Sequence, residues 1–409
     1  MIFQFVVLFV SLTQNVSLLQ NSVGVGGGTY EAVLSAMYEL GQFEDLLQAV
    51  PLQAQPPATV AIFFSVVSDV WKDLDHTTLG EAKKALYLAV KKRTTAGGVD
   101  VVVEEDLTDD TAGIMPGYRT LYLVDTHISM AATAAIADWV RAGGVVFATA
   151  GAGAFDEFNR PNTRMAELLG VKRGKITPSK QPVELSRRDL PYATPLDTVR
   201  LHTEALTGES LPAYGVVETG VAPAAGTEVL ASFATSNTSA LTLHNVGRGA
   251  AFACSFLPSF AFLHPALPAK PLDTCPRIDC YSQFFPSAFD MVAHSLIHLP
   301  DTMRGGRLPS LTVAQAKQAT GHAASSDALV EAVVLTPSGG DAGALVLLVN
   351  WQMDPATNLT ITIQSSAAGG FKTAVLASSD EAVPFTASGG AVRLRVPAVP
   401  YADAVMLRP

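Results

Sequence analysis

One stretch, Leu121–Val171, restricts the fold of this chain more than any other part of the sequence. An apolar run at 121–124 is followed by a helical pattern of apolar residues that ends at Gly143-Gly144. A second apolar run at 145–149 leads into a loop of small residues and then a short helix closed by Gly170. This alternation of strands and helices is typical of a parallel sheet with crossover helices. The sequence therefore predicts an α/β fold.

The flanking residues continue the same pattern. We expect strands at 60–64, ending at Ser65 and Ser68-Asp69, and at 101–103, with a helix between them that begins at the capping-box sequence Thr78–Glu81. Four strands with alternating helices predict a flavodoxin-like, doubly wound sheet. From Lys172 onward the helical rhythm stops, which predicts a β-rich extension of this domain. Its strands are expected at 229–233, 240–244 and 250–256, and a helix at 287–299.

The sequence divides into four parts. Residues 1–57 hold an apolar stretch and one predicted helix, residues 58–300 form the α/β domain, and residues 301–328 have the composition of a linker. Residues 329–409 carry short apolar runs separated by Gly, Ser, Asp and Pro, a spacing that predicts a small C-terminal β-sandwich. These runs lie at 330–335, 345–351, 359–363, 373–376, 392–396 and 404–407.

The N-terminal run and the glycosylation sequons bear on the location of the protein. The apolar run 2–12 resembles the core of a signal peptide and is too short for a membrane span, but it lacks a basic flank. Glycosylation sequons at Asn15, Asn237 and Asn358 are compatible with secretion. The alternatives are a secreted protein and a truncated gene product.

Composition narrows the classes of partner and cofactor. Hydrophobic residues make up 48% and charged residues 16% of the chain, so buried cores are expected. A formal net charge of -10 without a basic cluster argues against nucleic acid and anionic membranes as partners. Cys275 and Cys280 flank a short loop and form a possible disulfide, whereas Cys254 lies in an apolar pattern typical of a core. No metal site or cofactor motif is predicted.

The candidate site residues gather at the carboxyl ends of the predicted strands, where open α/β sheets bind ligands. They are Asp69, Asp125, His127, Asp156, Glu157, Asn159 and Arg160. Asp156 and Glu157 are neighbours whose side chains usually point apart, so they do not make a glycosidase carboxylate pair. We interpret their loop as a surface turn capped by Asp156 or Asn159, with a subunit or barrel interface as the alternative. A lone His127 is interpreted as structural, and a hydrolase site around Asp69, Asp125 and His127 is the competing hypothesis.

Several motifs, taken in order, resemble the trimerisation domain in the middle of β-galactosidases of glycoside hydrolase family 42. They are 139–144, Asp156-Glu157 with Asn159-Arg160, 166–171, 228–233 and 245–249, and more loosely 399–401 and 405–407 in the tail. The resemblance implies a class I glutamine amidotransferase-like fold without amidotransferase chemistry. It also implies a homo-oligomer or a glycosidase barrel as partner, with carbohydrate as a possible ligand.

The departures from that family shape the functional prediction. A catalytic (β/α)₈ barrel needs about 250 residues, and the first α/β strand is expected at residue 60, so no catalytic glutamate can be assigned. Amidotransferase chemistry needs a cysteine on the turn after a strand, where this chain has Ala150-Gly151. We therefore predict a non-catalytic oligomerisation or accessory portion of a glycoside hydrolase. The alternatives are a stand-alone hydrolase and a secreted carbohydrate-binding protein.

Overall fold

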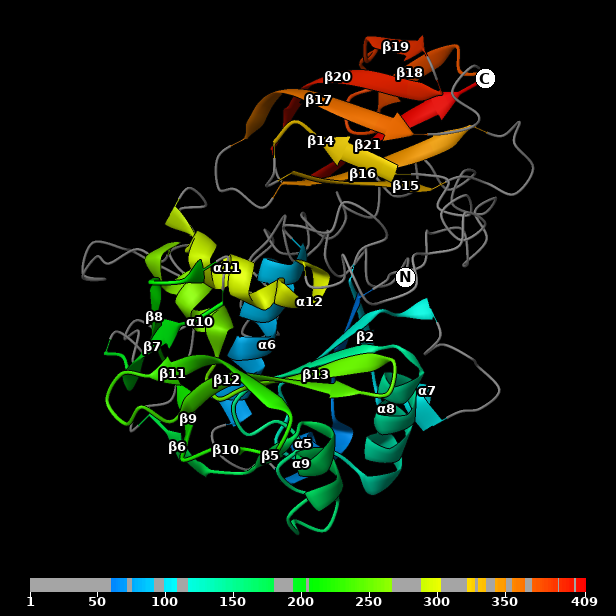
Figure 1. The fold of residues 1–409 in the computed structure, drawn as a ribbon. Helices are drawn as coiled ribbons and strands as arrows, with labels where there is room; N and C mark the ends of the chain where they lie inside the picture. The colour runs from blue at the N-terminus through cyan, green and yellow to red at the C-terminus, as the bar shows by residue number, and fades with distance from the viewer. Residues whose placement is uncertain are drawn as a thin grey trace, which may run out of the picture.

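The computed structural model describes residues 60–71, 76–91, 99–108, 117–179, 194–203, 206–266, 288–302, 322–327, 330–335, 343–350, 355–364, 370–388, 390–400 and 402–409. Within these residues, one nine-stranded mixed sheet with helices is joined by two four-stranded sheets (Figure 1). The α/β class predicted from the sequence is confirmed. The predicted N-terminal part, Cys275, Cys280 and Asn15 lie outside the described residues.

The large sheet has the order β2-β1-β3-β4-β13-β12-β11-β7-β8. The parallel strands are β1 (Val60–Phe63), β2 (Val99–Val102), β3 (Thr120–Leu123), β4 (Val145–Ala148) and β13 (Gly249–Cys254). The antiparallel half contains β12 (Ser239–Val246), β11 (Thr227–Phe233), β7 (Asp197–Leu201) and β8 (Ser210–Ala213). Because β13 pairs with both β4 and β12, the β-rich extension continues the parallel sheet edge to edge.

Two short antiparallel pairs lie outside this sheet. One joins β5 (Val171–Lys172) to β10 (Ala222–Pro223), and the other joins β6 (Lys175–Pro178) to β9 (Val216–Thr219).

Each face of the parallel strands has its own core, because alternate residues of a strand point to opposite faces. Ile62 packs in the cluster that includes α6 (His76–Lys91), α10 (Pro258–Leu263) and α11 (Met291–Ile297). Phe63 packs in the second cluster, which includes α7 (Glu104–Thr108), α8 (Met130–Ala142) and α9 (Thr163–Leu168). The remaining helical turns are α5 (Val66–Trp71), η4 (His264–Ala266) and α12 (Leu299–Thr302).

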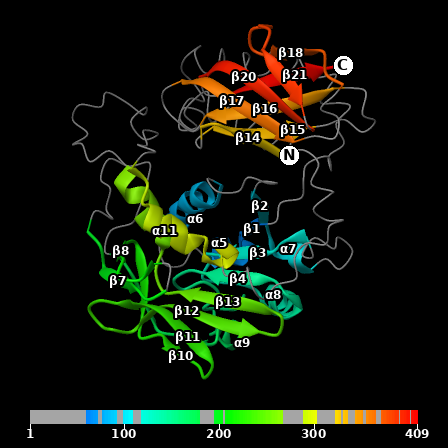
Figure 2. The same cartoon turned by 45° about the horizontal axis from the view of Figure 1, so that its top comes forward.

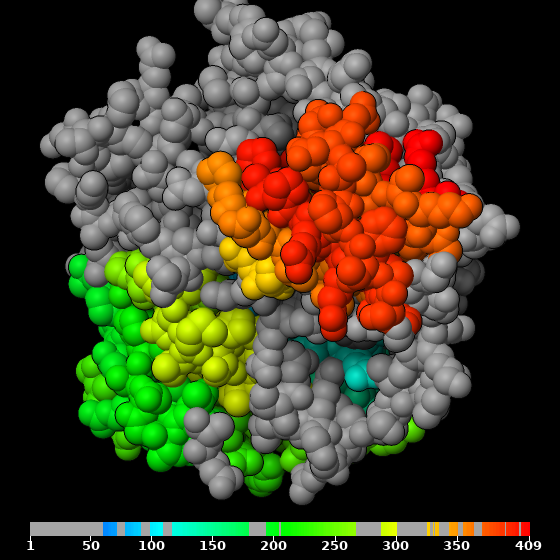
Figure 3. Space-filling view, turned by 90° about the horizontal axis from the view of Figure 1, so that it is seen from above, coloured from blue at the N-terminus to red at the C-terminus, as the bar shows by residue number. Residues whose placement is uncertain are grey.

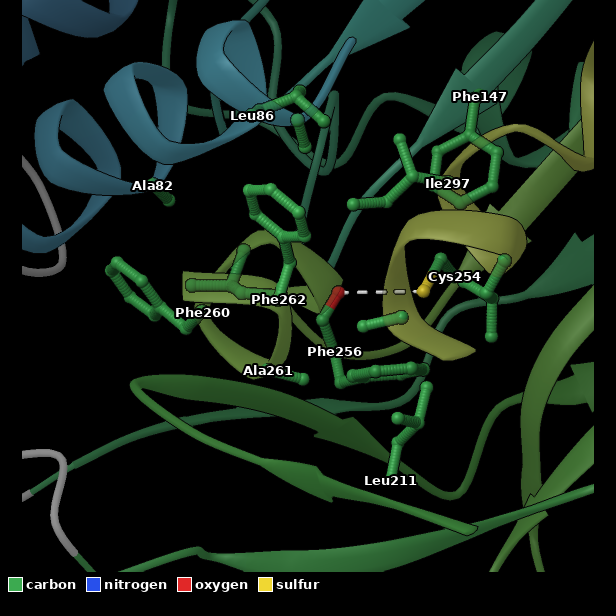
Figure 4. Packing of buried hydrophobic residues seen from close by; sticks show 14 of the residues in the cluster. Ala82, Leu86, Phe147, Leu211, Cys254, Phe256, Phe260, Ala261, Phe262 and Ile297 are labelled. Carbon is green, nitrogen blue, oxygen red and sulfur yellow. Dashed lines mark hydrogen bonds between the residues drawn. The ribbon is translucent and has the colours of Figure 1, made fainter. Parts of the chain in front are cut away.

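Helix α10 fills the centre of the first core with aromatic rings (Figure 4). Phe256, Phe260 and Phe262 are fully buried there, and Pro258 stands at the start of the helix, where its missing N–H has no helical acceptor to lose. The sequence after residue 256 shows no usable periodicity, because all six residues of α10 are buried and neither face is polar. Cys254 is also buried, its thiol donates to the Phe256 carbonyl oxygen at 3.5 Å, and burial raises its pKa.

The C-terminal sheets share one core. Their orders are β14-β17-β20-β19 and β15-β16-β21-β18, and buried residues from both, such as Val346 and Ile361, belong to one cluster. Their bounds are β14 (His322–Ser325), β15 (Val330–Leu335), β16 (Ala344–Asn350), β17 (Ala356–Gln364), β18 (Thr373–Leu376), β19 (Phe385–Ser388), β20 (Ala391–Val399) and β21 (Ala402–Arg408). Figures 1 and 2 place these sheets together at one end of the molecule, and Figure 3 shows their outer surface. Strand β14 falls inside the stretch predicted as a linker.

The hydroxyl of Tyr122 on β3 links the sheet to the helical layer, and its removal tests this packing. The hydroxyl is buried and donates to the Ile297 carbonyl oxygen at 2.9 Å. We expect Tyr122→Phe to lower the free energy of unfolding by about 1–3 kcal/mol, because the Ile297 carbonyl loses a buried donor. Urea denaturation followed by circular dichroism measures this change.

Tyr118→Phe is the matched control. The Tyr118 hydroxyl donates to Asp100 at 2.9 Å at an exposed position, so its loss should change stability by less than about 0.5 kcal/mol. Equal effects of the two substitutions would contradict the role assigned to Tyr122.

Candidate functional site

The strand order reverses between β1 and β3, since β1 leads to β2 on one side and pairs with β3 on the other. In open α/β sheets, ligands bind beyond the carboxyl ends of the strands at such a switch point. Ser65 follows β1 and Asp125 follows β3, so both residues lie at this point.

Asp125 is buried and both of its carboxylate oxygens are engaged. Oδ2 accepts the backbone N–H of Ser65 at 2.7 Å, and Oδ1 lies 2.8 Å from Nζ of Lys83 on α6. The Lys83 ammonium also lies 4.0 Å from the ring centroid of Phe64, at the distance of a cation–π contact. The carboxylate that the sequence suggested for a site is thus one half of a buried ion pair.

Glu104, which follows the end of β2, contacts the same group of residues. It directly follows the loop after β2, and its Oε1 accepts the Ser65 hydroxyl at 2.6 Å while its Oε2 accepts the N–H of Val66 at 3.0 Å. Ser65 is fully buried, so its hydroxyl has no access to solvent. We call Ser65, Lys83, Glu104 and Asp125 the strand-end network.

The structure places Asp69 in a helix and not at the end of a strand. The sequence placed it at the end of the first strand, but it lies in helix α5, where its N–H donates to the Ser65 carbonyl oxygen at 3.2 Å. The run Val66–Trp71 folds back as a helical turn because Glu104 accepts the otherwise unpaired Val66 N–H at its start.

His127 is fully buried between two aromatic rings. Its ring centroid lies 5.7 Å from that of Trp71 and 5.0 Å from that of Phe155, with interplanar angles of 13° and 26°. Nε2 is 3.0 Å from Oδ1 of Asn159, and Nδ1 is 3.0 Å from the Thr126 hydroxyl. Because an amide oxygen only accepts, Nε2 carries the proton. Both ring nitrogens are therefore engaged in structural hydrogen bonds.

The loop after β4 is held by its own side chains. Oδ1 of Asp156 accepts the N–H groups of Phe158 and Arg160 at 2.9 and 2.8 Å, and Asn159 adopts a positive φ of 58°, which asparagine tolerates. Glu157 instead accepts the N–H of Met130 at 2.8 Å at the start of α8. The two carboxylates thus point to different partners.

Helix α9, which follows this loop, has a cap of its own. Its N-cap is Asn162, whose Oδ1 accepts the N–H of Met165 at 3.0 Å, while Asp156 accepts the N–H groups of the turn before it. Its Nδ2 donates to the hydroxyl of Thr133 at 2.9 Å, so the cap also ties α9 to α8.

Sequence reasoning missed a second buried ion pair, Glu218 with Arg173. Glu218 on β9 accepts the N–H groups of Gly151 and Gly174 at 3.2 and 2.8 Å, and its Oε2 lies 3.0 Å from Nη2 of Arg173. Burial lowers the pKa of Arg173, and the charge of Glu218 partly offsets that shift. Neither residue stood out in the sequence, because Glu218 is an isolated charge and Arg173 stands in the basic run Lys172–Lys175, which is typical of a solvated surface.

A cavity of about 930 Å³ adjoins this pair. Helix α9 forms one wall and the β5–β10 pair another, while the loop after β4 contributes Ala154, Phe155 and Pro161. Its polar lining residues are Asn162, Thr163, Glu167, Lys172, Arg173, Glu218 and His244.

Large apolar side chains are exposed beside the strand-end network. Val66, Val70 and Trp71 of α5 are 44%, 75% and 43% exposed, and Phe158 is 64% exposed. The indole N–H of Trp71 donates to the Glu157 carbonyl oxygen at 3.0 Å, which joins α5 to the loop that carries Phe158. The ring of Phe158 in turn lies 5.3 Å from the Arg160 guanidinium carbon. We call these four apolar residues the strand-end patch.

Other predicted features are placed as follows. The turn Ala150-Gly151 carries no nucleophilic side chain, and the preceding Thr149 hydroxyl donates to the Leu123 carbonyl oxygen at 3.3 Å. Asn237 and Asn358 are both exposed. Over the described ranges, no three metal-ligating side chains come together, and none of the helices has the length and apolarity needed to cross a bilayer.

Comparison with known proteins finds likeness in structure but not in sequence. No protein-family model matches the chain, and no curated protein matches it. The structure is similar to a β-galactosidase from Bacillus circulans sp. alkalophilus, with a TM-score of 0.53 and 13% identity over 93% of this chain and 45% of that one.

Two further glycosidases show the same likeness. A family 42 β-galactosidase from G. stearothermophilus, solved as a catalytic mutant, has a TM-score of 0.52 at 14% identity over 93% of this chain and 44% of that one. The α-L-fucosidase isoenzyme 2 from Paenibacillus thiaminolyticus has a TM-score of 0.51 at 14% identity over 94% and 53%. The chain therefore shares a fold with about half the length of these glycoside hydrolases.

The Asp125–Lys83 pair yields a direct stability prediction. We expect Asp125→Ala to lower the free energy of unfolding by about 1.5–3 kcal/mol, because it leaves the buried Ser65 N–H without an acceptor and removes the carboxylate partner of Lys83, whose side chain is 15% exposed. Lys83→Met should lower the free energy of unfolding by less in an Asp125→Asn background than in the parent protein, since the two residues interact. Urea denaturation of the parent, the two single variants and the double variant gives the coupling energy.

Asp138→Ala is the control for this cycle. Asp138 pairs with Arg141 on the exposed side of α8, so its loss should cost less than about 1 kcal/mol. An Asp125→Ala protein no less stable than Asp138→Ala would show that the strand-end network does not hold the fold.

Proposed function

We propose that the chain is a non-catalytic oligomerisation and accessory portion of a β-galactosidase-like glycoside hydrolase, with a role in carbohydrate metabolism. The observation that carries the proposal is the strand-end patch. It exposes Val66, Val70, Trp71 and Phe158 next to a switch point whose polar groups bind one another. An apolar surface beside a closed crevice suits contact with another protein better than contact with a small substrate.

The fold supports the same proposal. The order β2-β1-β3-β4 is that of flavodoxin-like sheets, as expected for a class I glutamine amidotransferase-like domain over residues 58–300. The solved glycosidases that share this fold are about twice as long as the matched part. In this proposal the part of those glycosidases that the chain does not match corresponds to a glycosidase barrel. Copies of the chain associate through the strand-end patch. In this proposal the C-terminal sheets, which begin with β14, form the accessory part of the protein.

The engaged carboxylates weigh against a stand-alone hydrolase. Glycosidases need two carboxyl groups that face the scissile bond from opposite sides. Asp125, Glu104 and Glu218 each accept at least two donors from the protein itself, and each is at most 8% exposed. Using any of them as an acid or base would first break these contacts.

A carbohydrate-binding module has weaker support. Sugar platforms need exposed aromatic rings, but among the described residues of the C-terminal sheets no large apolar side chain is strongly exposed. Phe371 and Phe385 pack against the shared core, and Trp351 lies outside the described residues.

Association through the strand-end patch is tested by charge substitution. We expect the parent protein to form an oligomer in sedimentation velocity runs. Val70→Asp with Phe158→Asp should weaken its association more than about tenfold, since each apolar side chain contributes about 1.5–3 kcal/mol when buried. Met291→Asp, at a 51% exposed position on α11, is the matched control and should leave association unchanged.

Two results would contradict the proposal. The first is an oligomer whose dissociation constant is the same with the patch variant and the Met291→Asp control. The second is hydrolysis of p-nitrophenyl β-D-galactoside by the parent protein, because that would show that the chain is catalytic by itself.

A further inference from the structure

We propose that the cavity beside Arg173 binds a small carboxylate that also carries hydroxyl groups, such as a sugar acid or a hydroxy acid. The proposal rests on the cavity and its buried ion pair, and it stands whether or not the chain associates with a glycosidase. The volume of about 930 Å³ lies within the range of ligand sites, roughly 300–1,000 Å³.

Arg173 supplies the donors for the carboxylate. Its Nε and Nη2 atoms are buried and make no hydrogen bond with the described residues, although Nη2 lies 3.0 Å from Glu218 Oε2. Glu218 is already engaged by the N–H groups of Gly151 and Gly174. A buried donor without an acceptor costs about 1–3 kcal/mol, so an acceptor from the cavity would stabilise this guanidinium.

The two atoms that make no hydrogen bond, Nε and Nη2, also define the shape of the acceptor. Nε and Nη2 stand side by side on the guanidinium and present parallel N–H bonds, which a carboxylate accepts with both oxygens. The protein covers both atoms, whereas the side chain as a whole is 18% exposed. Arg173 lines the cavity, so a ligand there lies against this side chain.

His244 supplies a ring nitrogen for a ligand hydroxyl. The Thr227 hydroxyl donates to the Gly170 carbonyl oxygen at 2.9 Å, so its single proton is already used. His244 Nδ1, 3.0 Å from the same hydroxyl, must then donate to it. This leaves Nε2 as the ring nitrogen that can meet a ligand hydroxyl, on a residue that lines the cavity.

The charges around the cavity favour a ligand with a single negative charge. Arg173 and Lys172 are positive, whereas Glu218 and Glu167 are negative, so the lining is balanced overall. A carboxylate adds one charge next to Arg173, while a phosphate dianion would add a second charge close to Glu218. The apolar residues of the walls suit the carbon skeleton of a small molecule.

D-Glucuronate is the first probe, and binding is followed by ligand-observed NMR and calorimetry. We expect it to bind with a dissociation constant of about 1 mM or lower, and D-glucose and acetate to bind at least about tenfold more weakly. L-Lactate distinguishes an acyclic hydroxy acid from a sugar acid. Equal binding of acetate and glucuronate would overturn the role of His244, and no binding of glucuronate or lactate at about 10 mM would overturn the site.

Three variants locate the binding. Arg173→Lys keeps the charge beside Glu218 but removes the paired donors, and should weaken glucuronate binding at least about tenfold. Ala166→Phe fills the cavity from α9 without touching the ion pair and should abolish binding in a protein with parent-like circular dichroism. Arg164→Lys, on α9 but outside the cavity lining, is the matched control and should bind as the parent does.

The outcomes separate this site from the proposed association. Unchanged glucuronate binding in Arg173→Lys or in a folded Ala166→Phe protein would overturn the assignment. Glucuronate binding should also persist in the Val70→Asp and Phe158→Asp protein, because the strand-end patch shares no residue with the cavity lining.

Discussion

The ion pair of buried Asp125 with partly buried Lys83 is the interaction on which the α/β half of the molecule depends. A buried charge is tolerated only when it is paired and hydrogen bonded, so the pair fixes the groups around it. Asp125 holds the end of β3 against the N–H of Ser65 after β1, and Ser65 holds Glu104 after β2. Three strand ends and helix α6 are thereby joined in one set of contacts, and the first turns of α5 and α7 begin from it.

This same network limits what the strand ends can do. Open α/β sheets bind ligands in a crevice at the switch point. Here the polar groups at the switch point form hydrogen bonds with one another instead. The surfaces that stay available lie on either side of the loop after β4. On one side Trp71 bonds to Glu157 and the strand-end patch is exposed, and on the other side Gly151 bonds to Glu218 beside the cavity. Protein contact and ligand binding are thus assigned to separate faces of one loop.

The sequence predicted the backbone of this arrangement better than its polar partners. The expected runs 121–124 and 145–149 correspond to β3 and β4 within one residue at each end, because buried strands read as continuous apolar runs. The expected meeting of His127 with the loop after β4 is also present, through Asn159. Lys83, Glu104 and Glu218 were not predicted, since their partners lie 42, 39 and 67 residues away in the chain. Helix α5 was missed because its six residues lack a polar face long enough to show a period.

Hydrogen–deuterium exchange at increasing protein concentration is the most direct test of the central claim, that the strand ends are a closed scaffold for protein contact. The segments 66–71 and 155–160 should become more protected as the protein associates, while the strand interiors stay protected at every concentration. Addition of a β-galactoside should leave both segments unchanged. The claim would be contradicted if protection of these segments did not change with protein concentration, while protection around Ser65 and Asp125 rose on addition of the galactoside. That result would identify an open catalytic crevice instead.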